Sequence, residues 1–350
     1  MVESALRHFW RRSREVARTL DDLAQLSGVS RATVSRVING GSVSPETRQK
    51  VLDVLETTTY RPNLAARNLA SGKSGVVGVV MHVAAQLTVS DNYFAGLLTG
   101  ICDSLTEQAA GMMLWLGNRT KEETLDQILS MGMLDGIIVT ADTIDDPLVD
   151  GLRSSGVPSV LIGHRRADSD ASYVDIDSES AAESITDHLV GLGRKRIGHI
   201  TGRPDSVSGR DRTTGYERSL RRAGLQVTGL IAEGDYTAEG GYKAAVQLIE
   251  TGVDAIFCAS DNTALGALDA IRNASLRVPE DIALAGFDDL KFAAELDPPL
   301  TTIRQDIQGI GQAAAQNLVR LLGNPEGGPR RILLPTEMVI RQSTVGGSLQ

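Results

Sequence analysis

The chain has 350 residues, which is more than one ordinary domain and less than three, so two or three folding units are expected. Apolar residues make up 41% and charged residues 23%, the balance of a soluble globular protein. The net charge of −9 disfavours a nucleic-acid binder or a protein on an anionic membrane, because both partners attract basic surfaces.

That charge is divided unevenly along the chain. Residues 1–73 contain 12 Lys or Arg and 7 Asp or Glu, a net charge of +5, whereas residues 74–350 contain 23 and 37, a net charge of −14. A basic head on an acidic body makes nucleic acid a candidate partner of the head alone.

The cysteine count and the apolar runs indicate the compartment. Two cysteines, Cys102 and Cys258, are too few for a disulfide framework or a cysteine-rich zinc site, and both stand in apolar runs, so we expect them in the core. No apolar run reaches the roughly 20 residues that span a bilayer, and Arg interrupts the first residues throughout, where a signal peptide would be apolar. A cytoplasmic protein without cofactor or metal is expected.

Three short helices are predicted between residues 19 and 60. They follow a basic segment at 1–18 that we expect to be a flexible N-terminal extension. Thr19, Ser30 and Ser44 are suited to cap these helices, because each is a hydroxyl residue placed before an apolar pattern of helical spacing. Three helices within about forty residues form a small bundle.

The first two helices match a helix-turn-helix frame. Ala24, Gly28 and Val34 stand at its first, fifth and eleventh places. The small Ala lets the helices approach, Gly28 supplies the positive φ of a tight turn, and Val34 packs the second helix on the first. With three capped helices and a local positive charge, this pattern favours DNA binding over a plain helical bundle.

In such a motif the second helix leads into the major groove with its N-terminal residues. Arg pairs bidentately with guanine and a small apolar side chain contacts the thymine methyl, so we assign base reading to Arg31, Ala32 and Arg36. Hydroxyl and amide side chains suit phosphate oxygens, or else only cap and solvate the helix. These residues are Ser30, Thr33, Ser35 and Asn39.

Residues 61–74 form a junction of two or three helical turns, too short to be stably helical alone in water. After it, apolar strand-like runs alternate with helical stretches, which predicts right-handed βαβ units and parallel sheets. The predicted strands are 76–83, 112–117, 136–140, 159–163, 197–201, 255–259 and 282–287. The predicted helices are 94–110, 120–131, 178–192, 209–223, 238–251, 262–273 and 307–322. Because one sheet of this length would be unusually large, two α/β lobes with a cleft are expected.

Particular motifs identify a family resemblance over about residues 19–343. The head and junction read TLDDLAQLSGVSRATVSRVIN, SPETRQKV and YRPNLAARNLASGK, followed by VVGVV. The body contains SVSGRDRTTGY, EGDYTAEGGY, ASDNTALGALDAI, VPEDIALAGFDD and PPLTTIRQD. In combination these motifs resemble the lactose repressor/galactose repressor (LacI/GalR) family of bacterial transcription regulators.

The resemblance implies a homodimer on a palindromic operator, and a particular domain plan. The helix-turn-helix head spans 19–60, a hinge helix spans 61–74, and a core at 75–345 resembles periplasmic sugar-binding proteins. The N-lobe of this core comprises about 75–176 and 303–333, and its C-lobe about 177–302 and 334–345. The fold class is therefore a small all-α head plus an α/β core of two doubly wound parallel-sheet lobes.

The resemblance also gives the junction a role. In the family the hinge helix folds on operator DNA and wedges a Leu between base pairs in the minor groove, and Leu69 matches that residue. The alternative is that Leu69 merely packs against the core. Further DNA contacts are implied at Thr19, Leu20, Tyr60, Asn63 and Ala66.

The family resemblance implies a small effector, a sugar or sugar derivative, in the cleft between the lobes. Arg212 and Asp288 match the family's polar clamp, and such a pair suits sugar hydroxyls, which both donate and accept. From spacing alone, each would be read as a surface salt-bridge residue. The resemblance adds Tyr93, Phe94, Tyr236, Asp261 and Gln305.

The chain departs from the family's usual residues at three ligand-facing positions. His164 follows the strand-like run SVLIG where many members carry an acid, Ser260 stands where many carry Asn, and His82 replaces a smaller or acidic residue. The two histidines are either effector contacts or structural residues. The identity of the effector, and whether it induces or co-represses, stay open.

Two other classes of protein compete with this interpretation: an α/β enzyme, or a sugar-binding protein, with a fused helix-turn-helix. SGKS at 71–74 lacks the first glycine of a phosphate loop, since Arg67 stands there, and no nucleophile elbow or zinc motif occurs. A non-enzymatic repressor is therefore expected.

No leucine heptads follow VIRQSTVGG, which predicts a dimer. We expect effector binding to change the angle between the lobes, and with it the ordering of the hinge segments on DNA.

Overall fold

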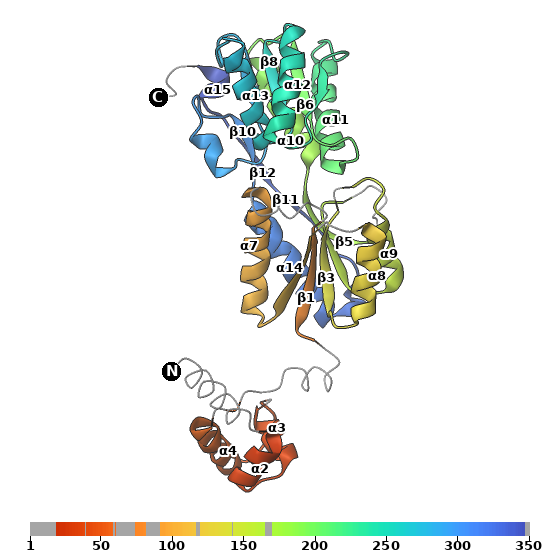
Figure 1. Cartoon of the computed structure of the whole chain (residues 1–350), viewed down its shortest axis with the longest axis vertical. Coiled ribbons are helices and arrows are strands. Elements are labelled where there is room, and N and C mark those ends of the chain that lie inside the picture. The colour runs from red at the N-terminus through yellow and green to blue at the C-terminus, as the bar shows by residue number, and fades with distance from the viewer. Residues whose placement is uncertain are drawn as a thin grey trace, which may run out of the picture. The chain divides into compact units, whose positions relative to one another are not determined.

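The computed structural model describes residues 19–38, 40–58, 60, 74–81, 92–116, 120–141, 143–164 and 170–346. The chain divides into two compact units, residues 1–74 and 75–350 (Figure 1). The positions predicted at Asn39, Asn63, Ala66, Leu69 and His82 lie outside the described residues.

The first unit contains α2 (Leu20–Ser27), α3 (Arg31–Ile38) and α4 (Pro45–Thr57). Its caps are those that the sequence predicts. Thr19 and Asp22 form a capping box, and Gly28 ends α2 in the left-handed conformation at φ 66°. Leu23, Val34 and Val51 are fully buried at the centre of the bundle, so each helix contributes to one small core.

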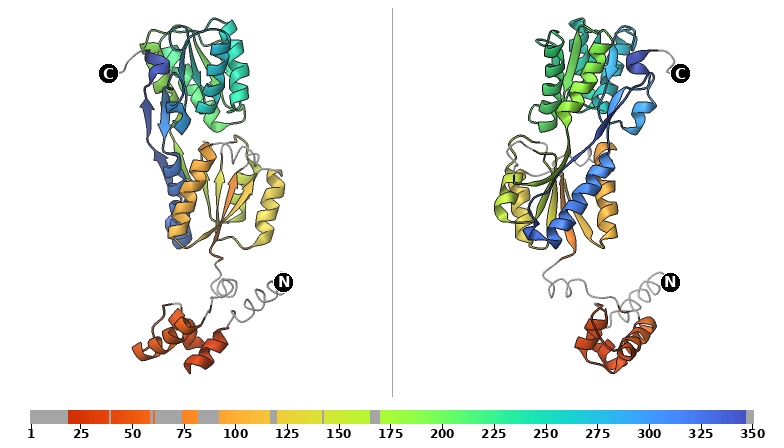
Figure 2. Two further views of the ribbon diagram at one scale, coloured as in Figure 1. Left: turned by 60° about the vertical axis from the view of Figure 1, so that its left-hand side comes forward. Right: turned by 180° about the vertical axis from the view of Figure 1, so that it is seen from behind.

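The N-lobe of the second unit is a parallel sheet in the order β11-β5-β4-β3-β1-β2. The strands are β1 (Val76–Met81), β2 (Gly111–Leu116), β3 (Gly136–Thr140), β4 (Ser159–Ile162), β5 (Ser172–Ile176) and β11 (Arg331–Leu334). Helices cover both faces of this sheet, as Figures 1 and 2 show. They are α7 (Asn92–Glu107) with α14 (Ile307–Gly323), and α8 (Lys121–Met131) with α9 (Pro147–Ser155).

The C-lobe is a second parallel sheet in the order β7-β6-β8-β9. Its strands are β6 (Ile197–Thr201), β7 (Ile231–Glu233), β8 (Ala255–Cys258) and β9 (Ala283–Ala285). Helices α10 (Ser178–Gly191) and α11 (Val207–Arg222) pack together, as do α12 (Ala238–Glu250) and α13 (Asp261–Asn273). Three short helices complete the core: η1 (Lys291–Ala294), η2 (Pro325–Gly327) and α15 (Gln342–Val345).

The chain crosses between the lobes three times: after β5, between β10 (Thr302–Gln305) and α14, and between β11 and β12 (Thr336–Val339). Strands β10 and β12 pair antiparallel, with Thr302 opposite Val339 and Gln305 opposite Thr336. The view from behind in Figure 2 shows this strand pair running between the two lobes.

The structure corrects several expectations. Cys258 is buried, but Cys102 is exposed, because it lies on the side of α7 opposite the buried Leu97 and Ile101. Strand β2 is an edge strand with partly exposed residues rather than one buried on both faces. The sequence analysis missed β5, β7, β10, β11, β12 and α9. Polar residues interrupt most of these strands, whereas the start signal of α9, Asp146 before Pro147, was present in the sequence.

Candidate functional site: recognition helix and inter-lobe cavity

The exposed side of α3 carries the residues predicted to read bases. Arg31, Ala32 and Arg36 are exposed, whereas Val34 and Val37 of the same helix are buried in the bundle. Helical periodicity explains this separation, since the two sets lie on opposite sides of α3. Arg31 Nη1 lies 3.7 Å from Asp21 Oδ2, and both side chains are about two-thirds exposed, so DNA phosphates or bases can compete for Arg31.

The residues predicted to contact phosphate lie at the start of the same helix. The Ser30 hydroxyl accepts from the Thr33 backbone N–H at 3.2 Å, and the two hydroxyls lie 2.8 Å apart. Ser30 therefore caps the helix, as one of its two predicted roles requires. Leu20 and Tyr60 pack against the bundle core, while Thr19 is exposed at its N-cap position.

In the second unit, a cavity of about 170 Å³ lies between the lobes at the carboxyl ends of the strands. This is where open α/β sheets bind ligands. Seven of the ten residues predicted for the effector line it: Tyr93, Phe94, Arg212, Tyr236, Ser260, Asp288 and Gln305.

Arg212, on α11, forms part of the buried wall of this cavity with a side chain only 7% exposed. Its Nη1 donates to the Ala259 carbonyl, and its guanidinium carbon lies 3.7 Å from the centre of the Phe287 ring. Its Nε has no hydrogen-bond partner, and among the described residues no other buried side-chain nitrogen or oxygen lacks one. A buried donor left unpaired is costly, and an oxygen atom placed beside it would remove that cost.

Asp288 faces Arg212 across the cavity wall, with Oδ1 at 3.7 Å from Arg212 Nη1. The same oxygen accepts from Gln305 Nε2 at 2.6 Å, and Asp288 itself adopts φ 113°, a strained conformation for a non-glycine residue. The three predicted residues are therefore brought together as one polar cluster, built from α11, the segment after β9, and β10.

Asp261 is placed differently. It is fully buried and does not line the cavity: its carboxylate accepts from the Thr302 hydroxyl and the Leu290 backbone N–H, both at 2.7 Å. Burial, with Asp288 nearby, raises the pKa of Asp261 well above its usual value. These bonds fix the segment that carries Asp288, so Asp261 supports the site from behind.

His164 also stands outside the lining residues, but it contacts one of them. Its Nδ1 lies 2.6 Å from Asp175 Oδ2, and its ring stacks on Tyr173 at 4.4 Å. Asp175 lines the cavity and was not predicted.

Tyr236 adopts φ 66°, and its hydroxyl lies 2.8 Å from both the Ser206 and Ser208 hydroxyls. The neighbouring Gly202 is required, because a Cβ there would stand 2.0 Å from the Tyr236 ring. Opposite, Thr143 of the N-lobe forms an isolated antiparallel bridge with Ser206 of the C-lobe. Backbone hydrogen bonding thus joins the lobes beside the cavity.

Sequence reasoning missed several lining residues. They are Thr140, Thr143, Ile162, Gly163, Val174, Asp175, Ile176, Ser178, Arg203, Val207, Ser208, Asp211, Asp235, Thr237, Asn262 and Ile310. Most of them lie at or just beyond the end of a strand, or at the start of the helix that follows. That position is a signal which the predicted strand boundaries could have supplied.

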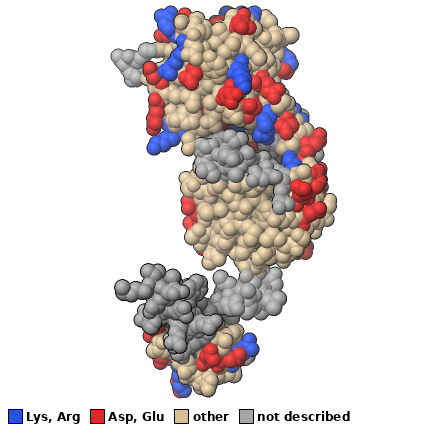
Figure 3. Space-filling model, viewed as in Figure 1, with Lys and Arg blue, Asp and Glu red and all other residues tan. Residues whose placement is uncertain are grey.

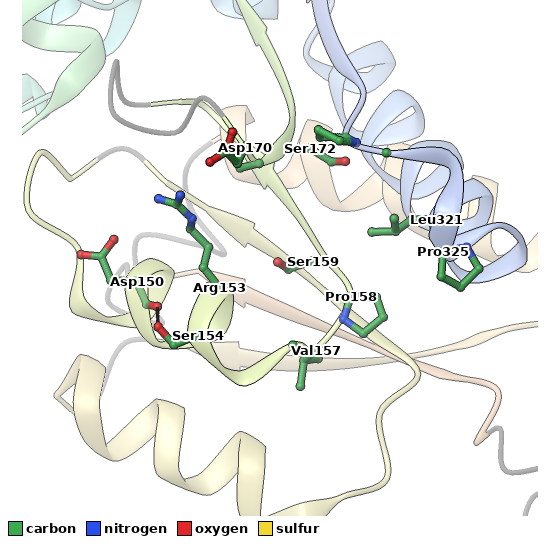
Figure 4. Close-up of a pocket in the computed structure, with 14 residues that line it drawn as sticks. Asp150, Arg153, Ser154, Val157, Pro158, Ser159, Asp170, Ser172, Leu321 and Pro325 are labelled. Carbon is green, nitrogen blue, oxygen red and sulfur yellow. Dashed lines mark hydrogen bonds between the residues drawn. The ribbon is translucent and has the colours of Figure 1, made fainter.

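A second hollow of about 640 Å³ lies on the N-lobe, where Figure 4 shows Arg153, Asp170 and Leu321 among its lining residues. It is larger, but it lies at the amino ends of β4 and β5, the opposite end of the sheet from the cavity. Ligands of parallel α/β sheets bind at the carboxyl ends, so we assign the functional site to the smaller cavity.

Comparison with known proteins adds two family matches and several relatives. Residues 19–63 match "Bacterial regulatory proteins, lacI family", and residues 186–344 match "Periplasmic binding protein-like domain". The transcriptional regulator CelR of Thermobifida fusca is 36% identical over 332 residues, covering 93% of this chain and 98% of CelR. Catabolite control protein A of Priestia megaterium is 33% identical, covering 93% of this chain and 99% of that protein.

Two solved structures extend the comparison. The complex of the transcriptional regulator CelR with cellobiose has a TM-score of 0.74 and 34% identity, covering 93% of this chain and 99% of the other. The lac repressor dimer bound to operator and the anti-inducer ONPF has a TM-score of 0.83 and 29% identity, covering 94% of this chain and 100% of the other.

Proposed function

Because this chain belongs to the lacI family of bacterial regulatory proteins, we propose that it represses transcription from a palindromic operator, under control of a sugar-like effector. It is a DNA-binding transcriptional regulator with a helix-turn-helix head and a periplasmic-binding-protein-like core. The observation that carries the effector proposal is the unpartnered, buried Nε of Arg212 in the wall of the inter-lobe cavity.

The proposed DNA contacts divide into two kinds. Arg31, Ala32 and Arg36 read base edges in the major groove, because they are exposed on the side of α3 away from the bundle core. Ser30, Thr33 and Ser35 contact phosphates and set the register. The assignment of Asn39 to phosphate contact rests on its amide side chain. The family resemblance alone supports the assignment of the remaining DNA contacts, which are Thr19, Leu20, Tyr60, Asn63, Ala66 and Leu69.

We also infer a homodimer, since the lac repressor structure to which the chain is similar is a dimer on its operator. Figure 3 shows one face of the N-lobe whose middle is almost without charged side chains. Depletion of charge is typical of interface cores. Sedimentation of the full chain measures the assembly.

The chain's relatives are named transcriptional regulators, and we infer that the chain is likewise not an enzyme. Among the described residues, no cluster of three or more His, Cys, Asp or Glu side chains is arranged to hold a metal ion. A regulator of bacterial operators acts in the cytoplasm, on the nucleoid. Within the described part of the chain, no helix is both long and apolar enough to cross a membrane.

The test is an operator-binding assay with and without sugars. Full-length protein is titrated onto a palindrome from its own promoter region, and cellobiose is the first sugar, because CelR is solved with it. We expect specific binding, and a change of about 5- to 150-fold when the effector is present, the usual range of allosteric coupling. Absence of specific DNA binding would refute the repressor.

The variant Arg212→Lys tests whether Arg212 contacts the effector. Lys keeps a positive charge opposite Asp288 but lacks the Nε donor. Operator affinity without sugar should be retained, while the response to sugar is lost or needs far higher concentrations. A normal sugar response in this variant would remove Arg212 from the effector site.

A further inference from the structure

Carboxylates outnumber guanidinium groups around the inter-lobe cavity. Among the residues that the structure describes, four lining carboxylates, those of Asp175, Asp211, Asp235 and Asp288, face two guanidinium groups, those of Arg203 and Arg212. The formal charge of this lining is therefore −2. A low-dielectric cleft with an excess of one sign of charge disfavours ligands of the same sign.

Both guanidinium groups already have carboxylate partners. Arg203 Nε lies 3.2 Å from Asp205 Oδ1, and Arg212 Nη1 lies 3.7 Å from Asp288 Oδ1 while also donating to a backbone carbonyl. Capture of a phosphate or carboxylate by Arg uses two parallel N–H donors. Neither Arg offers its whole charge to a ligand anion without losing the carboxylate beside it.

Helix N-termini are the other common means of holding an anion. The cavity is bordered by the start of α7, at Tyr93 and Phe94, and by the N-termini of α11, α12 and α13. Each of the latter three is capped by its own side chain: Ser206 accepts from Gly209 N–H at 3.0 Å, Thr237 from Gly240 N–H at 2.9 Å, and Ser260 from Thr263 N–H at 3.1 Å. A fourth helix, α10, is capped by the carboxylate of Asp177. In these four helices, α10 to α13, a side chain therefore already accepts from one of the N–H groups that could bind a phosphate.

We propose that the effector is an uncharged polyhydroxylated ligand, and that the four carboxylates exclude phosphorylated and carboxylated sugars. The proposal rests on the assignment of this cavity as the effector site. Sugar hydroxyls donate to carboxylate oxygens, and the Arg212 Nε donates to a sugar oxygen. An anionic substituent would instead meet carboxylates on several sides.

Matched sugar pairs test the exclusion directly. Binding to the full chain is measured by calorimetry for cellobiose against cellobiose 6′-phosphate, glucose against glucose 6-phosphate and glucuronate, and galactose against galacturonate. Wherever either sugar of a pair binds, we expect the uncharged one to bind at least about 100-fold more tightly. The reason is that like-charge contacts cost several kcal/mol, and 1.4 kcal/mol corresponds to a tenfold change in affinity. Equal or tighter binding of an anionic member overturns the exclusion and leaves the repressor assignment intact.

A panel in which no member binds would instead overturn the sugar effector of the proposed function, and the exclusion with it. Operator binding, measured in the same samples, shows whether the DNA-binding part of the function survives.

Substitution of the carboxylates separates charge from shape. In Asp211→Asn/Asp235→Asn, the Asn oxygen at 235 can still accept from Thr237, whose N–H and hydroxyl lie 3.0 and 2.6 Å from Asp235 Oδ1. We expect the preference for the uncharged member to fall by about tenfold or more. Asp269→Asn, on the exposed side of α13, is the matched control and should leave the preference unchanged. An unchanged preference in the double variant would show that the carboxylates do not set it.

Discussion

Asp288 and Asp289 are consecutive residues with positive φ angles of 113° and 55°, yet their carboxylates have different partners. Asp288 lines the cavity and accepts from Gln305, whereas Asp289 accepts from Arg304 and Arg341 at 2.7 Å each. Because Asp288 and Asp289 share one peptide unit, a displacement of Asp288 also displaces Asp289. The proposed effector site is thus directly linked to the strands that cross between the lobes.

Arg304 extends this link and supplies the first prediction. It joins Asp289 to Glu337 of β12, at 2.7 and 2.9 Å, and so ties both crossing strands to the segment that carries Asp288. Arg304→Gln should leave the affinity for the effector, measured without DNA, nearly unchanged. It should reduce the free energy by which the effector changes operator binding, a coupling that is typically about 1–3 kcal/mol.

The measurement is operator affinity at zero and saturating effector, in the variant and in the matched control Arg277→Gln, whose exposed ion pair with Asp281 lies away from the crossing strands. Equal coupling in both variants would show that Arg304 does not carry the signal.

The second prediction concerns base reading by α3. Arg36 is exposed on the recognition helix, so Arg36→Ala should lose about 1–3 kcal/mol of operator affinity and relax the preference at one base position. Binding is measured on an operator and on its single-base variants. Lys50→Ala, which removes an exposed charge from α4, is the control. A loss that is the same on every DNA sequence would assign Arg36 to phosphate contact.

The third prediction is a pH dependence that comes from His199. This side chain is fully buried, stacks on the Tyr216 and Phe257 rings, and contacts the Phe257 carbonyl at 2.9 Å and the Thr213 hydroxyl at 3.2 Å. Burial lowers the pKa of His199 from 6.5 to about 4. The unfolded chain therefore binds more protons between these values, and stability falls as the pH falls from 6.5 towards 4.

The His199 contribution approaches about 3 kcal/mol at the acid end of that range, since one pKa unit corresponds to 1.36 kcal/mol. Urea unfolding of the wild type and of His199→Gln at pH 7 and pH 4.5 isolates it, because His188, whose pKa burial also lowers, is present in both. We expect the wild type to lose more stability than the variant on acidification. Parallel losses would disprove the assignment.

Local signals explain why much of the fold could be predicted. The caps at Thr19 and Ser44, the turn at Gly28 and the alternation of buried strands with helices are set by neighbours in sequence. Apolar strands such as β3 and β8 are continuous because helices cover both faces of each sheet. Short or polar strands such as β7 and β10 lack a continuous apolar run, and only their pairing with a neighbouring strand identifies them.

The candidate site could be predicted only in part. Arg212 and Asp288 were found through family motifs. Asp175 was missed because it lies in β5, a strand that was not predicted. Asp235 stands in the motif EGDYTAEGGY, but only its neighbour Tyr236 was assigned to the site. Asp261, in the same predicted set as Asp288, turned out to be buried behind the cavity wall.

The sequence by itself determined the basic helix-turn-helix head, the acidic α/β body and the family, because caps, periodicity and motifs act over short stretches of chain. Only the tertiary structure decided which polar residues converge. Whether a carboxylate such as Asp261 or Asp288 meets a backbone N–H or an open cavity depends on segments far apart in the chain that folding brings together. The excess of carboxylates around the cavity, and hence the preference for an uncharged ligand, follows from that convergence.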